Sequence, residues 1–132
     1  MDAISRRARA VRAPITGGLV LGAALALLPA LVGAHAFPDR SEPRVGHTLA
    51  VPPAQVRIWF DGAIEVTFST IRVENADKQR IDKGDGHVDS TDSTLLVVTL
   101  PPSLPPGRYR VFWSVIARDG HRTEGDFQFR IK

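Results

Sequence analysis

Apolar and polar residues alternate along several stretches of the chain after residue 34. In residues 56–60, valine, isoleucine and phenylalanine alternate with arginine and tryptophan, and residues 126–131 repeat the pattern with phenylalanine and isoleucine at every second position. Successive side chains of a β-strand point to opposite faces of a sheet. This alternation therefore predicts strands that bury one face.

Three further runs complete the predicted strands. Phe68, Ile71 and Val73 mark one of them, residues 95–100 form a short run rich in β-branched side chains, and residues 109–116 are apolar on both faces. A strand with two apolar faces is covered on both sides, so residues 109–116 are predicted to lie at the centre of a sheet.

Turns rich in proline and glycine separate these runs, at residues 52–53, 61–62, 83–86 and 105–107. The sequence shows no helical period after residue 34. Short strands between such turns predict an all-β fold, a Greek-key β-barrel or sandwich of the immunoglobulin-like or cupredoxin-like type. The polar segment 82–93 is predicted to be an exposed loop or an irregular hairpin.

Residues 1–34 have the parts of a secretory signal helix. Four arginines precede an apolar stretch of about 14 residues that ends in small side chains. That stretch is shorter than the roughly 20 residues of a membrane-spanning helix, so an uncleaved anchor is the less favoured alternative. Cleavage after Ala34 makes His35 the first residue of a 98-residue secreted domain. Ala34-His35-Ala36 is a second cleavage pattern, and the sequence leaves the choice between Ala34 and Ala36 open.

Removal of this signal changes the charge balance. The chain has 17 lysines and arginines and 14 aspartates and glutamates, but the signal holds four of the arginines and one aspartate. The charges of the remaining 13 basic and 13 acidic residues cancel. The domain therefore lacks the excess of basic residues that would indicate a nucleic-acid partner. There is no cysteine, and the single methionine is Met1. The domain therefore lacks disulfides and the soft sulfur ligands that Cu(I) prefers.

Two segments offer metal-binding chemistry. As a first residue, His35 presents an α-amine and an imidazole to the same ion. Asp119-Gly120-His121 lies between two predicted strands, and side chains two residues apart in extended backbone share a face. Three nitrogens and one carboxylate suit Cu(II). Taken alone, Asp-Gly-His is more often a solvated turn in which the aspartate caps local amides.

Four short motifs spread over residues 35–132 form a set. They are His35-Ala36-Phe37 through Ser41-Glu42-Pro43 with Gly46, Phe68-Ser69-Thr70-Ile71, Leu104 through Val111 with Trp113, and Asp119-Gly120-His121 with Gly125-Asp126-Phe127. Each motif alone is unspecific. Together they resemble the CopC/PcoC family of copper-resistance proteins, and the resemblance covers essentially all of the predicted domain.

The resemblance implies a periplasmic domain that binds Cu(II) through the amine and imidazole of His35 together with Asp119 and His121. It also implies a role in copper resistance or homeostasis, in which copper is sequestered or passed to a CopD-type inner-membrane protein. We expect a monomer that is not embedded in the membrane. Some family members use a methionine-rich loop for Cu(I); this chain lacks it, so Cu(II) alone is expected.

The chain departs from the family at the end of the first core strand. The family often has an acid at the position of Gly62, whereas here the acid, Asp61, lies one residue earlier. If that acid orients a ligand imidazole, its role is lost or shifts to Asp61.

Two other functions fit parts of the sequence. An amine–imidazole copper site also resembles that of polysaccharide monooxygenases. A carboxylate bound to the metal, however, favours holding copper over activating oxygen. We therefore expect no enzymatic activity. The β-pattern alone equally fits a metal-free immunoglobulin-like interaction module. His47, His87 and Glu124 are expected to be solvated residues outside the site.

Overall fold

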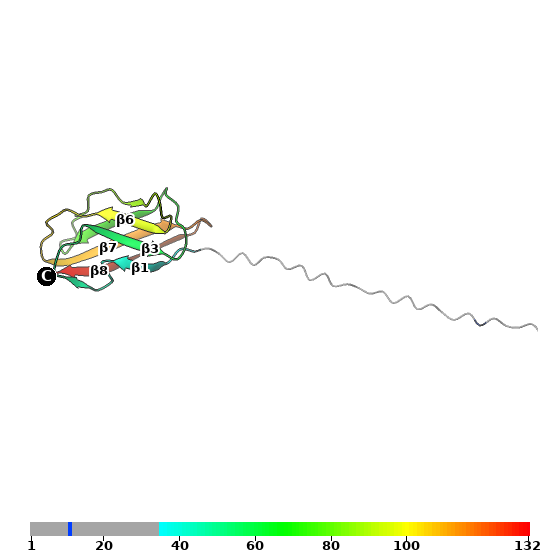
Figure 1. Cartoon of the computed structure of the whole chain (residues 1–132), viewed down its shortest axis with the longest axis horizontal. Helices are drawn as coiled ribbons and strands as arrows, with labels where there is room; N and C mark the ends of the chain where they lie inside the picture. Colours follow the sequence, from blue (N-terminus) through cyan, green and yellow to red (C-terminus); the bar gives the residue numbers. More distant parts are fainter. Residues whose placement is uncertain (1–10, 12–34) are drawn as a thin grey trace, which may run out of the picture. The chain divides into compact units, whose positions relative to one another are not determined.

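A computed structural model describes Val11 and residues 35–132, and the latter form two four-stranded β-sheets (Figure 1). One sheet has the strand order β1-β3-β6-β5 and the other the order β2-β8-β7-β4. The predicted all-β sandwich is confirmed. The predicted signal helix lies outside the described residues, apart from Val11. The strands are β1 (Pro38–Glu42), β2 (Thr48–Leu49), β3 (Gln55–Phe60), β4 (Thr70–Asn75), β5 (His87–Val88), β6 (Leu95–Thr99), β7 (Gly107–Ile116) and β8 (Arg122–Ile131).

The longest strands match the hydrophobic pattern. β7 lies between β8 and β4, as its two apolar faces predict. Its antiparallel pairing with β8 runs without interruption from Gly107 opposite Ile131 to Ile116 opposite Arg122. This long hairpin is the rigid element that supports the connection between residues 116 and 122.

The core lies between the two sheets. From β3 it includes Val56 and Ile58, which are fully buried, and from β8 it includes Phe129, which is 1% exposed. Trp113 of β7 packs edge-on against Phe60, with ring centroids 5.3 Å apart. Alternate residues of β3, β4, β7 and β8 thus bury apolar surface, as the sequence pattern predicts.

The segment around Phe68 differs from the prediction. Phe68, expected within a strand, precedes β4 and is 71% exposed, with a φ of 68°. The buried hydroxyl of Ser69 donates to the carbonyl of Glu65 at 2.6 Å, so the chain turns before β4 begins. In the segment 82–93, predicted to be an exposed loop or an irregular hairpin, His87 and Val88 form the short strand β5, which pairs antiparallel with β6.

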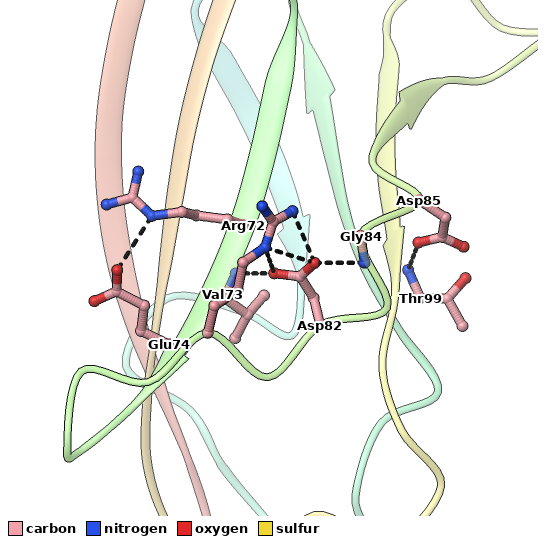
Figure 2. A network of polar contacts seen from close by, with 8 residues as sticks. Arg72, Val73, Glu74, Asp82, Gly84, Asp85 and Thr99 are labelled. Carbon is pink, nitrogen blue, oxygen red and sulfur yellow. Dashed lines mark hydrogen bonds and ion pairs between the residues drawn. The ribbon is translucent and has the colours of Figure 1, made fainter.

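The connection from β4 to β5 is held by Asp82. Its carboxylate accepts hydrogen bonds from the amides of Val73 and Gly84, both at 2.8 Å, as Figure 2 shows. Arg80 donates to the same carboxylate at 3.0 Å, and the Asp82 side chain has no exposed surface. The next carboxylate, that of Asp85, accepts from the amide of Thr99 in the strand β6 at 2.8 Å. The segment is therefore anchored by polar contacts, those of the buried Asp82 carboxylate above all, rather than by an apolar pattern.

The start of β1 and the loop between β7 and β8 lie at one end of the sandwich, and the C-terminus lies at the other (Figure 1). In the part of the chain that the structure describes, no helix has the length and apolar character needed to span a membrane.

Candidate metal centre

The loop between β7 and β8 brings Asp119 and His121 together. The amide of Gly120 donates to the carbonyl of Ala117 at 2.9 Å, and the amide of Ala117 donates to the carbonyl of His121 at 2.9 Å. Gly120 has a φ of +86°. These features define a three-residue hairpin loop, Arg118-Asp119-Gly120, that ends in a glycine with left-handed backbone. Of the two backbone conformations that the sequence left open, extended and turned, Asp119 thus adopts the turn.

The turn directs the Asp119 carboxylate at the following histidine. One oxygen, Oδ1, accepts from the backbone amide of His121 at 2.9 Å. The other oxygen, Oδ2, lies 3.0 Å from Nδ1 of the His121 ring. The short side chain of an aspartate is well suited to such a local contact.

His35 reaches the same point from the other sheet. It directly precedes the segment that enters β1, and its Nδ1 lies 3.5 Å from Oδ2 of Asp119. The rings of His35 and His121 have centroids 4.8 Å apart and are inclined by 61°. The potential ligand atoms of His35, Asp119 and His121 lie within 4.8 Å of one another, close enough to share an ion. Among the residues that the structure describes, Val11 and 35–132, this is the one such group of three or more histidines or acidic residues.

The segment beside His35 is held in place by neighbouring residues. Ala36 is fully buried, and its carbonyl accepts a hydrogen bond from the hydroxyl of Thr123 at 2.6 Å. The amide of Phe37 donates to Oδ1 of Asp61 at 2.8 Å, and the amide of Asp61 donates back to the carbonyl of Phe37 at 2.9 Å. Residues 36 and 37 therefore contact both sheets of the sandwich.

The electrostatics favour a charged carboxylate. Hydrogen bonds from the ring and from the backbone amide of His121 hold the pKa of the Asp119 carboxyl below its ordinary value, and the nearby His121 and His35 rings act in the same direction. The side chains are 44% exposed at His35, 20% at Asp119 and 67% at His121. The group is thus open to an ion from solution and offers one anionic oxygen between two imidazoles.

The other sequence candidates lie outside this group. His47, His87 and Glu124 are exposed and take no part in it. The Nδ1 of His87 instead lies 2.7 Å from the carbonyl of Asp85. Asp61, which the sequence singled out, contacts the backbone of Phe37 and not a candidate ligand ring.

A comparison with protein families decides what the chain belongs to. The family model described as the CopC domain matches residues 39–132. The chain belongs to the CopC family. The match includes Asp119 and His121, whereas His35 lies four residues before its start.

Individual relatives agree with the CopC assignment. The chain is 33% identical over 107 residues to the copper transport protein CutJ of Bacillus subtilis, which covers 81% of this chain but only 20% of that protein. The crystal structure of CopC from Methylosinus trichosporium OB3b matches with a TM-score of 0.65 and 26% identity, over 74% of this chain and 94% of that one. PcoC, a methionine-rich copper resistance protein from Escherichia coli, matches with a TM-score of 0.65 and 24% identity, over 75% of this chain and 100% of that one. At that identity, the likeness to PcoC shows the fold alone.

The resemblance read from the motifs is thereby confirmed at the level of family and fold. The roles of His35, Asp119 and His121 as metal ligands stay predictions. Sequence reasoning missed Thr123 and the burial of Ala36, because neither residue type signals a contact with the segment that precedes β1.

Proposed function

We propose that this chain is a periplasmic copper-binding protein that holds Cu(II) through the amine and imidazole of His35, the carboxylate of Asp119 and the imidazole of His121. The observation that supports this most is the meeting of these three side chains from two sheets at one exposed point. Nitrogen donors with one carboxylate are a ligand set that Cu(II) prefers.

The proposal requires His35 to be the first residue of the mature protein, so that its amine is free. We propose cleavage of the signal after Ala34. The burial of Ala36 and the hydrogen bond from Thr123 to its carbonyl support this choice, since cleavage after Ala36 removes both contacts.

The absence of sulfur ligands in residues 35–132 supports Cu(II) over Cu(I) as the ion held. PcoC is described as methionine-rich, whereas the only methionine of this chain is Met1. A carboxylate placed between two imidazoles also suits retention of the ion, and we propose no catalytic activity.

We propose that the protein sequesters copper or passes it to a CopD-type inner-membrane partner. CutJ, named a copper transport protein, is a longer chain of which the match covers a fifth. The occurrence of a CopC-like segment within a longer protein named for copper transport supports a transport partner for this chain.

The decisive experiment is a competitive Cu(II) titration of the exported protein, read by EPR. The full chain is expressed in a bacterial host, the mature form is purified from the periplasm, and its mass gives its N-terminus. We expect a protein that begins at His35 and binds one tight equivalent of Cu(II), with several nitrogen couplings. Weak or multiple binding by this form contradicts the proposal.

The matched control inserts Ser-Pro between Ala34 and His35. The insertion moves the free amine two residues away from His35. The inserted proline has no backbone N–H, so its nitrogen does not bind the ion in place of that amine. We expect a severe loss of Cu(II) affinity with the fold retained. Unchanged affinity in this variant excludes the amine as a ligand.

A further inference from the structure

The candidate ligands are divided between two parts of the fold. Asp119 and His121 belong to one rigid hairpin, but His35 precedes β1 of the other sheet. Their spacing therefore depends on how the segment before β1 is attached. The β1–β3 register is irregular between Pro38 and Arg40, and before it the amide of Asp61 donates to the carbonyl of Phe37. The first residues of a domain fray unless other contacts tie them down.

Two side chains provide such contacts on either side of the Ala36–Phe37 peptide. Thr123 of β8 donates to the carbonyl of Ala36 at 2.6 Å, and Asp61, at the end of β3, accepts from the amide of Phe37 at 2.8 Å. The buried methyl group of Ala36 lies in the core between them. The backbone adjoining His35 is thus fixed to both sheets at once.

Neither side chain belongs to the candidate ligand group. Thr123 lies in β8, two residues after His121. Its hydrogen bond therefore joins the residue that follows His35 to the strand that follows His121. Asp61 completes the attachment from the side of β3.

The geometry points to Asp61 and Thr123 as positioning residues for the metal centre. They hold the amine and imidazole of His35 over Asp119 and His121, so that the ion meets its ligands already arranged. A preorganised ligand set binds more tightly because less conformational freedom is lost on binding. This inference rests on the function proposed above and deepens it, since it states what sets the lifetime of the bound ion.

The test compares Asp61→Ala with Asp61→Asn and Thr123→Val with Thr123→Ser in the mature protein. Alanine and valine remove the hydrogen bond, whereas asparagine keeps an acceptor and serine keeps a donor. Loss of one such bond is expected to raise the Kd for Cu(II) about tenfold, mainly through faster dissociation. The EPR spectrum of the Ala and Val variants should show a second copper species with fewer nitrogen couplings. The Asn and Ser variants should stay within about threefold of the wild-type Kd, well short of that loss.

Tyr109→Phe serves as the matched control for general destabilisation. Its hydroxyl also donates to a backbone carbonyl, that of Pro105, but at the opposite end of the β7–β8 hairpin. We expect this variant to lower the midpoint of thermal unfolding without altering the Kd or the EPR spectrum.

The outcomes separate the two proposals. If the wild-type protein shows no tight equivalent of Cu(II), the proposed function fails. If the wild type binds tightly and the Asp61→Ala/Thr123→Val double variant, still folded, binds with the same Kd and spectrum, the positioning role is overturned.

Discussion

Gly120 occupies the last position of the β7–β8 loop, with a φ of +86°. A Cβ built at this position meets no atom within 4 Å, so space does not restrict the residue. The restriction is the backbone conformation itself, which L-residues with a side chain rarely adopt. This single conformation turns the Asp119 carboxylate back toward His121, and the candidate site depends on it.

Gly120→Ala is expected to lower the free energy of unfolding by about 1–2 kcal/mol, because alanine is strained in left-handed backbone. Gly120→Asn is expected to cost less, since asparagine tolerates this region. Urea unfolding of the three metal-free proteins measures the difference. Equal stability of the Ala and Asn variants would contradict an origin of the stability loss in the left-handed backbone conformation.

At the scale of elements, the segment between β4 and β5 relies on one buried carboxylate. Burial of Asp82 acts to raise the pKa of its carboxyl, but the hydrogen bonds from Arg80, Val73 and Gly84 and the Arg80 charge outweigh this effect and hold the pKa below its ordinary value. A group whose pKa is lowered by folding stabilises the fold above its unfolded pKa. That contribution is lost as the pH falls through the folded pKa.

Asp82→Asn is therefore expected to destabilise the protein at pH 7 by about 1–3 kcal/mol, because the buried charged acceptor of hydrogen bonds from Arg80, Val73 and Gly84 is removed. The difference from wild type should shrink as the pH falls below the ordinary pKa of an aspartate, about 4, and through the lower pKa of the folded wild-type carboxyl. Chemical unfolding of both proteins between pH 7 and pH 3 measures it. A difference that does not change with pH would assign the effect to packing alone.

At the scale of the whole molecule, the proposed metal centre joins the two sheets. His35 is attached next to β1, and Asp119 and His121 belong to the β7–β8 hairpin of the other sheet. An ion held by all three links the sheets at one end of the sandwich. Because such an ion binds the folded state and not the unfolded chain, it stabilises the fold by mass action.

Free Cu(II) at 100 times its Kd is expected to stabilise the wild-type protein by about 2.7 kcal/mol. For a domain of this size, that is a rise of roughly 10–20 °C in Tm. His121→Ala should lose most of this rise, and a chelator should reverse it in the wild type. Calorimetry of both proteins with and without Cu(II) gives the result; an equal rise in His121→Ala would exclude the proposed ligand set.

Hydrophobic alternation was sufficient to determine the all-β class and the central position of β7, because the period of side chains along a strand is a local property. The motifs likewise determined the CopC family, and the Asp119-Gly120-His121 spacing marked one half of the candidate site. The family resemblance implied that His35 joins this turn. Only the tertiary structure decided what holds it there, since the contacts of Ala36 with Thr123 and of Phe37 with Asp61 join residues far apart in the sequence. It also decided that Phe68 is exposed, because the turn set by Ser69 overrides the apolar character of the residue. Local pattern specifies elements, whereas the distances between ligands from different sheets depend on long-range packing that the pattern does not encode.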